Sequence, residues 1–194
     1  MTHTSILLLV SLSVLLACSP PKTGDDALPE ECIDASFHLK QGGYEFEVRV
    51  SGEGSLQQVE VRLKGFPDSL SSLRFDSEPV TGADAADLDG DGYPEVLVYT
   101  QSAGSGSYGS VTAYTYSPVE GFRPIIFPEL SEEAVLKSGY MGHDNFKLQG
   151  NRLIRNFPIY HSDATNSQPS DSSTSLVYSF LQDQKSPRFK LLEP

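Results

Sequence analysis

Residues 95–116 read EVLVYTQSAGSGSYGSVTAYTY, two runs rich in β-branched and aromatic residues on either side of a loop made almost wholly of Gly and Ser. Within the loop, Gly104-x-Gly106-x-x-Gly109 has the spacing of the dinucleotide-binding fingerprint, but that fingerprint requires a helix directly after it. The residues that follow, from Val111 to Tyr116, favour a pleated strand instead. The stretch therefore predicts a β-hairpin whose tip is the Gly-rich loop.

The tip has the composition of a recognition element. Small residues allow unusual backbone angles and a close approach to a partner. Tyr108 is the one aromatic residue in the loop. We therefore expect the tip to insert into a cleft of another molecule.

The rest of the chain also has strand character. Residues 44–50 and 59–64 alternate apolar and charged side chains with a period of two, which is typical of half-buried strands. Further strands are predicted at Ala35–Lys40, Pro94–Gln101, Ser110–Ser117, Asn145–Leu148, Arg152–Phe157, Ser175–Leu181 and Arg188–Leu192. One short helix is predicted over Glu129–Ser138, with Ser131 as a candidate cap and Gly139 after its end. The pattern predicts a mainly β, single-domain antiparallel sheet or sandwich with one short helix.

The first 17 residues form an apolar run that is too short for a permanent membrane span and is typical of a signal peptide. The run ends in Leu15-Leu16-Ala17-Cys18, which resembles the bacterial lipobox and implies lipidation of Cys18. Ser19 after the cysteine resembles the pattern of outer-membrane lipoproteins. Ordinary secretion with cleavage nearby is the alternative. The predicted location is the bacterial cell envelope, in the periplasm and anchored to the outer membrane through Cys18.

Residues 18–31 are rich in Pro, Gly and Asp and predict a tether, so that residues 32–194 form the folded domain. If Cys18 carries lipid, Cys32 has no partner in the chain and is either buried and inert or paired with another molecule. If Cys18 is not lipidated, a bridge between the two cysteines is open. Residues 162–175 are almost wholly polar and predict a long loop.

The chain is strongly acidic, with 26 Asp and Glu against 14 Lys and Arg and a formal net charge of −12. Such a surface repels nucleic acid and anionic lipid, and it speeds encounter with a basic protein. Solubility alone also accounts for the acidity.

A cluster of carboxylates precedes the hairpin, in the sequence DLDGDGYPE at residues 87–95. Calcium takes 6–8 oxygen ligands, and alternate positions of a tight loop direct oxygens inward. The loop begins like an EF-hand loop, but Val98 stands at its twelfth position and strands flank it; it resembles the short calcium loops of integrin-type and other β-repeat proteins. We expect a structural calcium ion, with an acidic surface turn as the alternative. The predicted ligands are Asp87, Asp89, Asp91, the carbonyl of Tyr93, and Glu95.

Enzyme signatures are missing from the sequence. No serine has the Gly-x-Ser-x-Gly spacing of a nucleophile elbow, and the histidines lack zinc-site spacing. The only paired carboxylates belong to the calcium-like loop, so no separate pair is available for glycoside hydrolysis. The sequence favours a protein that is not an enzyme, although a hydrolase with an unrecognised site is a further reading.

Four segments together resemble the periplasmic inhibitors of invertebrate-type lysozyme: residues 87–95, 97–109, 139–144 and 155–160. The resemblance covers residues 83–160. It implies a β-rich single domain whose Ser-Gly-x-Tyr loop enters the active-site cleft of a lysozyme. Here Ser105-Gly106-Ser107-Tyr108 has that pattern.

The resemblance implies that Ser105, Gly106, Ser107 and Tyr108 bind the partner. Gly104 belongs to the same loop, and Tyr140 and His143 are candidates for a flanking part of the binding face. A lysozyme cuts glycan with two carboxyl groups in a groove, so hydroxyl donors on a narrow tip suit an inhibitor. The expected partner is a lysozyme. The competing interpretation is a calcium-stabilised adhesion or assembly module of the envelope that uses the same hairpin on another partner.

Overall fold

A computed structural model of the chain describes residues 34–66, 68–130, 139–161, 168–183 and 186–192. The predicted signal peptide, the lipidation site Cys18, the tether and Cys32 lie outside these residues. Within the described part, no helix has the length and apolar character needed to cross a membrane.

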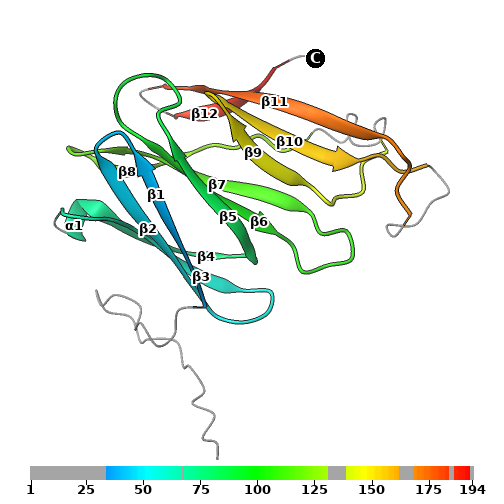
Figure 1. Cartoon of the computed structure of the whole chain (residues 1–194), viewed down its shortest axis with the longest axis horizontal. Helices are drawn as coiled ribbons and strands as arrows, with labels where there is room; N and C mark the ends of the chain where they lie inside the picture. Colours follow the sequence, from blue (N-terminus) through cyan, green and yellow to red (C-terminus); the bar gives the residue numbers. More distant parts are fainter. Residues whose placement is uncertain (1–33, 67, 131–138, 162–167, 184–185, 193–194) are drawn as a thin grey trace, which may run out of the picture.

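The described chain forms three antiparallel sheets of four strands each (Figure 1). The first sheet has the order β1-β2-β3-β4, the central sheet β5-β6-β7-β8, and the third sheet β12-β11-β10-β9. The strands are β1 (Ala35–Gln41), β2 (Tyr44–Ser51), β3 (Gln57–Leu63), β4 (Ser72–Ser77), β5 (Val80–Ala86), β6 (Glu95–Gln101), β7 (Gly109–Ser117), β8 (Gly121–Ile125), β9 (Asn145–Gln149), β10 (Arg152–Pro158), β11 (Ser173–Leu181) and β12 (Arg188–Leu191). The mainly β fold expected from the sequence is confirmed.

Strand β6 is buried on both faces, because the other two sheets pack against opposite sides of the central sheet. Val96 and Val98 belong to the core shared with the first sheet. Leu97 and Tyr99 belong to the core shared with the third sheet. Two sheets pack face to face about 10 Å apart, and a strand between two such layers has no solvent face. This explains the unbroken apolar run at the start of the hairpin.

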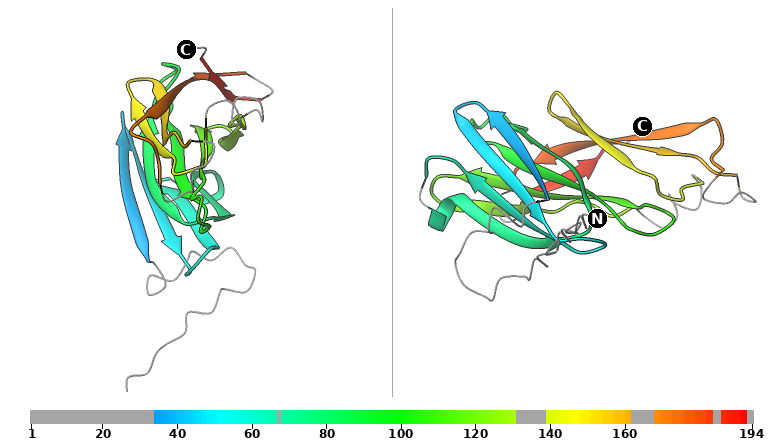
Figure 2. Two further views of the ribbon diagram at one scale, coloured as in Figure 1. Left: turned by 90° about the vertical axis from the view of Figure 1, so that its right-hand side faces the viewer. Right: turned by 60° about the horizontal axis from the view of Figure 1, so that its bottom comes forward.

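Figure 2 shows the green central strands between the blue and cyan first sheet and the yellow-to-red third sheet. One hydrophobic core lies on each side of the central hairpin. The first core is made by Phe46, Val48, Val50, Val59, Val61, Leu63, Val96, Val98 and Tyr116. The second core is made by Leu88, Leu97, Tyr99, Val111, Ala113, Ile125, Leu153, Tyr178, Phe180 and Phe189. Strands β6 and β7 contribute to both, so the loop that joins them projects from the most constrained part of the fold.

The predicted strands are all present, with ends that differ by one or two residues. The sequence analysis missed β4, β5 and β8. The predicted helix over residues 129–138 lies almost wholly outside the described residues, while one turn of helix, α1 (Asp68–Ser71), occurs where none was expected. Of the predicted loop at 162–175, residues 162–167 lie outside the described part, and its end was placed too late because β11 begins at Ser173.

Candidate functional site

The candidate site is the tip of the β6–β7 hairpin, residues 102–108. Strand β7 begins at Gly109, the last residue of the Gly-rich motif and one residue before the predicted start at Ser110. The Ser107 N–H donates to the Gly104 carbonyl at 2.9 Å, and Ser107 has a φ of 44°. Ser102 closes the tip twice, because its N–H donates to the Tyr108 carbonyl and its Oγ accepts from the Tyr108 N–H, both at 2.9 Å. The backbone of the tip is therefore held by its own hydrogen bonds.

A second loop, residues 139–144, braces the tip. The His143 N–H is shared between the carbonyls of Gly106 at 2.9 Å and Ser107 at 3.0 Å. This contact needs glycine at position 142, where φ is 91° and a Cβ would lie 1.9 Å from the Gly106 carbonyl oxygen. Position 106 is restricted less strongly, since a Cβ there would lie 2.5 Å from the Tyr108 ring, a side chain that can move. The two loops therefore meet backbone to backbone.

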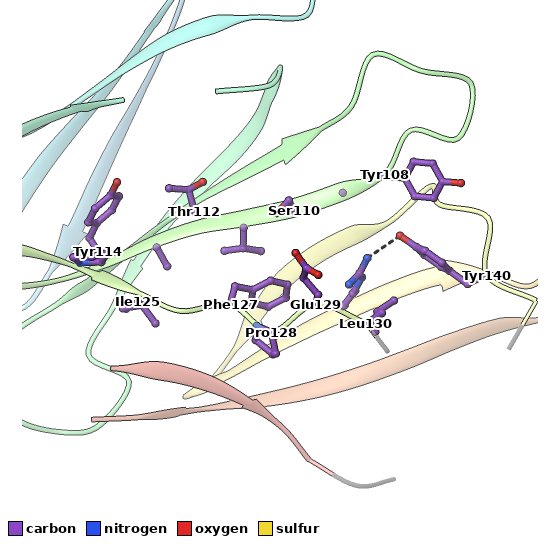
Figure 3. Close-up of a pocket in the computed structure, with 15 residues that line it drawn as sticks. Tyr108, Ser110, Thr112, Tyr114, Ile125, Phe127, Pro128, Glu129, Leu130 and Tyr140 are labelled. Atoms are coloured by element: carbon purple, nitrogen blue, oxygen red, sulfur yellow. Dashed lines mark hydrogen bonds between the residues drawn. The ribbon is translucent and has the colours of Figure 1, made fainter. Parts of the chain in front are cut away.

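Below this contact, a buried carboxylate ties the second loop to β7 and β10. Asp144 accepts hydrogen bonds from the Gly109 N–H at 2.8 Å, the Tyr140 hydroxyl at 2.7 Å and Arg155 Nε at 2.6 Å. Arg155 Nη2 also donates to the Tyr140 hydroxyl at 2.7 Å (Figure 3). The side chains of Asp144 and Arg155 are 0% and 6% exposed. A buried ion pair with this many hydrogen bonds holds its two segments in place, unlike an ion pair on the surface.

Burial and hydrogen bonding set the protonation states of Tyr140 and Arg155. Burial raises the pKa of Tyr140 well above its ordinary value, and the hydrogen bond to Asp144 raises it further. Burial alone would lower the pKa of Arg155, but the bond and the charge of Asp144 outweigh it and the pKa is raised. Tyr140 is therefore a neutral donor and Arg155 a permanent cation at any physiological pH.

Two hydroxyl groups of the tip face solvent. Tyr108 is 50% exposed, and its ring lies against Tyr140 with 5.8 Å between centroids. Ser105 is exposed. Neither hydroxyl has a hydrogen-bond partner among the described residues. Both are therefore available to an acceptor on a partner.

Most of the other residues predicted to bind a partner make hydrogen bonds within the chain. Gly104 is exposed, whereas Gly106 is buried and its carbonyl is used by His143. The Ser107 hydroxyl lies 3.4 Å from the Gly104 carbonyl. His143 Nδ1 lies 3.1 Å from the Tyr160 hydroxyl. Tyr140 and His143 are thus brought beside the tip, as supports.

Sequence reasoning assigned no role to four residues that hold the tip: Ser102, Gly142, Asp144 and Arg155. Asp144 and Arg155 lie in two of the segments that carry the family resemblance, and the available signal was Arg155, a charged residue inside a strand with alternating buried positions. The contact of Gly142 with Gly106 depends on tertiary packing. No local pattern predicts it.

A groove of about 640 Å³ runs from Tyr108 along β7 to Ile125, and Phe127 and Leu130 also line it. Figure 3 shows Tyr108 and Tyr140 at one end of the groove and Tyr114 at the other. Leu130, which lines the groove, is the last described residue before the gap at residues 131–138. The exposed tip and this groove share Tyr108.

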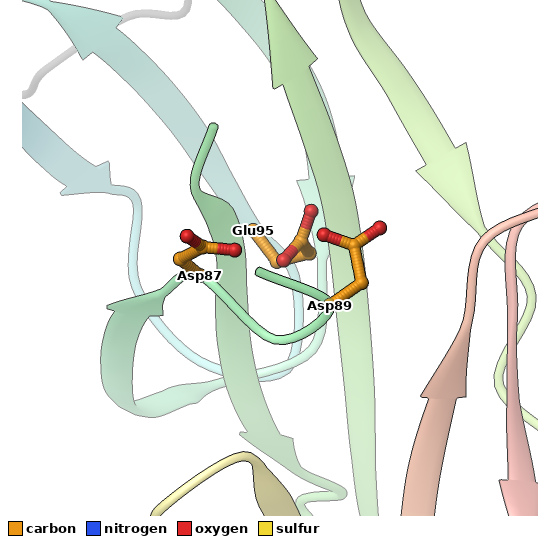
Figure 4. Close-up of side chains that lie close together, drawn as sticks. All are labelled: Asp87, Asp89 and Glu95. Carbon is orange, nitrogen blue, oxygen red and sulfur yellow. The ribbon is translucent and has the colours of Figure 1, made fainter. Parts of the chain in front are cut away.

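At the opposite end of β6, the β5–β6 loop gathers carboxylates. Asp87, Asp89 and Glu95 each place one oxygen within 4.8 Å of the others (Figure 4). Asp87 accepts from the N–H groups of Gly90 at 2.7 Å and Gly92 at 3.1 Å, and so sets the curl of the loop. The three side chains are the part of the predicted metal set that the fold brings together.

Glu95 is fully buried. Its Oε2 accepts from the Leu88 N–H at 2.8 Å, while Oε1 has no hydrogen-bond partner. Burial raises the pKa of Glu95 to about 7; the Leu88 N–H and the nearby Thr115 hydroxyl oppose the rise, and the charges of Asp89 and Asp91 add to it. The Thr115 hydroxyl lies near the carboxylate and lowers the pKa of Glu95 by hydrogen bonding, while Oε1 has no partner that meets hydrogen-bond geometry. The oxygen is therefore left for another ligand.

The other two predicted ligands are placed differently. Asp91 lies outside the three-carboxylate group, and its Oδ1 accepts from the Tyr93 N–H at 2.8 Å. Tyr93 is half-buried, with its ring 6.2 Å from that of Tyr44. Their part in metal binding stays a prediction.

No family model, no curated protein and no solved structure matches this chain. The functional argument therefore depends on the site itself.

Proposed function

We propose that the chain is a proteinaceous inhibitor of lysozyme in the bacterial cell envelope, directed at invertebrate-type lysozyme, and that the Ser105–Tyr108 tip enters the active-site cleft of that enzyme. The observation that carries the proposal is a narrow, braced tip with two unpaired hydroxyl groups, Ser105 and Tyr108. The motif resemblance to the inhibitors of invertebrate-type lysozyme supports the choice of target.

The chemistry of the target suits this tip. A lysozyme holds two carboxyl groups on either side of the glycan bond that it cuts. Hydroxyl groups that donate to these carboxyl groups would occupy the place of the substrate. A hydrogen bond to a charged group contributes roughly 1.5–3 kcal/mol, so each lost hydroxyl corresponds to about 10-fold to 150-fold weaker binding.

The bracing of the tip favours affinity because little ordering is left for the moment of binding. Each rotamer-rich side chain that is immobilised at an interface costs roughly 0.5–1.5 kcal/mol. Here the backbone of the tip is already fixed by Ser102 and by His143. The proposed inhibitor acts by occupancy and is not an enzyme.

The proposed location is the periplasm. It depends on the signal peptide and on acylation of Cys18, which together would leave the folded domain on a tether at the outer membrane. The net charge of −12 suits encounter with a basic lysozyme.

The test is an inhibition titration. Purified Ser19–Pro194 is added to an invertebrate-type lysozyme and, in parallel, to a chicken-type lysozyme, and the residual activity of each is measured. We expect selective inhibition of the invertebrate-type enzyme. Ser105→Ala and Tyr108→Phe should each raise the inhibition constant about 10-fold or more.

Ser55→Ala is the matched control, because Ser55 is an exposed serine in the turn between β2 and β3. It should inhibit like the unaltered chain. No inhibition at micromolar concentration by a folded chain would contradict the proposal, and binding to host cells or matrix in its place would indicate an adhesion or assembly module.

A further inference from the structure

We propose that the β5–β6 loop binds one calcium ion between Asp87, Asp89 and Glu95. This site lies at the other end of β6 from the hairpin tip, and it does not depend on the proposed inhibitor function. It would serve the stability of the fold.

The separation of the three carboxylates fits a single ion. Calcium holds its oxygen ligands at 2.3–2.6 Å, so that two ligands on opposite sides of the ion lie about 5 Å apart at most. The oxygens of Asp87, Asp89 and Glu95 all lie within 4.8 Å of one another. These separations are compatible with one calcium ion shared by the three carboxylates.

The state of Glu95 points independently to a ligand. Its side chain is fully buried, and a buried carboxylate oxygen without a hydrogen bond is costly. Its Oε1 has no partner, while Oε2 is held by the Leu88 N–H. Figure 4 shows Glu95 between Asp87 and Asp89. A cation at this point would satisfy the orphaned oxygen and offset the charge of all three groups.

The composition of the site favours calcium over softer metals. The described ligands are oxygens only, which suits Ca²⁺ or Mg²⁺ rather than zinc or copper. Asp89 is exposed to solvent, so water molecules can complete the 6–8 ligands that calcium takes. Magnesium demands a near-ideal octahedron at 2.0–2.1 Å and dehydrates reluctantly, which suits this loop less.

A bound calcium ion would link the end of β5 to the start of β6 in the central sheet. Asp87 follows the end of β5, and Glu95 is the first residue of β6. An ion held by both would fix the entry to the strand that both cores share. Binding to the folded chain alone raises its melting temperature by mass action.

Terbium luminescence is the direct test, since the chain has no Trp and Tyr93 lies within the loop as sensitiser. We expect calcium-displaceable luminescence from Tb³⁺ added to Ser19–Pro194. Calcium at about 100 times its Kd should raise Tm by roughly 5–10 °C, as seen by circular dichroism, and EGTA should reverse the rise. Equal concentrations of magnesium should give a smaller shift.

Glu95→Gln and Asp89→Asn test the assignment. Each should weaken calcium binding at least 10-fold and remove most of the Tm shift, while Glu53→Gln, at an exposed acidic residue in the β2–β3 turn, should change neither. Asp89 is exposed, so the Asp89→Asn variant keeps the fold intact even if Glu95→Gln does not. A folded chain without luminescence or Tm shift at 10 mM calcium, an equal response to magnesium, or binding that survives both substitutions would overturn the site. Lysozyme inhibition is measured separately on the same preparations. The calcium site and the inhibitor function can therefore be contradicted independently of each other.

Discussion

At the scale of single residues, the tip depends on glycines that permit contact and on one buried ion pair that fixes it. The Gly142 to Gly106 contact leaves no room for a side chain, and Asp144 and Arg155 hold the supporting loop against β7 and β10. The residues that support the tip therefore differ from those that are exposed on it.

Gly142→Ala should displace the tip without unfolding the protein. The added Cβ would lie 1.9 Å from the Gly106 carbonyl oxygen, so one of the two loops must move. We expect lysozyme inhibition to weaken about 10-fold or more, which the inhibition titration measures. Gly54→Ala is the matched control, because Gly54 also has a positive φ, 79°, but has open space around its Cβ position. Equal inhibition by the two variants would contradict the bracing role of Gly142.

Arg155→Met should destabilise the protein strongly, because it leaves the Asp144 carboxylate buried without its cation. Breaking a buried pair by removing one partner costs about 3–5 kcal/mol. Urea unfolding at neutral pH measures this free energy. Arg188→Met is the comparison, since the Arg188–Asp183 pair has side chains 47% and 42% exposed, and such pairs contribute about 0–1 kcal/mol. Similar losses for both variants would show that burial of Asp144 is not what matters.

At the scale of elements, β6 is the strand on which the fold is built. Its residues alternate between two cores rather than between core and solvent. The same strand carries the carboxylate loop at its start and the hairpin tip at its end, so it links both sites to the best-packed part of the molecule.

Leu97→Ala and Val98→Ala should both destabilise the chain, although the two residues are neighbours. Both side chains are fully buried, facing the third and first sheets respectively. Leu→Ala in a core costs about 2–5 kcal/mol, and the loss of two methyl groups in Val→Ala about 1.6 kcal/mol or more. Urea unfolding should show a clear loss for each and little for Leu191→Ala, at a partly exposed position on β12. A loss at only one of the two neighbours would mean that β6 has a solvent face.

The elements that sequence reasoning found and missed differ in composition. Strands with strong alternation or dense apolar runs, such as β2 and β6, were predicted because burial is visible in their residues. Strand β5 reads VTGADAA and β8 contains Pro124, so both have weak β-propensity of their own. They are strands because the central sheet pairs with them, which is tertiary information.

At the scale of the whole molecule, the sequence was sufficient for the fold class and the hairpin, but not for the three-layer arrangement. The unbroken apolar run of β6 indicates burial on both faces, but nothing local identifies the strands that cover each face. The exposed part of the candidate site was predicted because Ser105 and Tyr108 lie in one short segment, and of its supports only Tyr140 and His143 were named. Its supporting half, Gly142, Asp144 and Arg155, comes from another part of the chain and needs the fold to bring it to the tip.

The central claim is that this molecule presents a braced tip to the cleft of a lysozyme. The most direct measurement is the residual activity of an invertebrate-type lysozyme titrated with Ser19–Pro194 and with its Ser105→Ala, Tyr108→Ala double variant. We predict inhibition by the unaltered chain that the double variant loses while it keeps the same circular dichroism spectrum. Equal inhibition by the two, or none by either at micromolar concentration, would contradict the account.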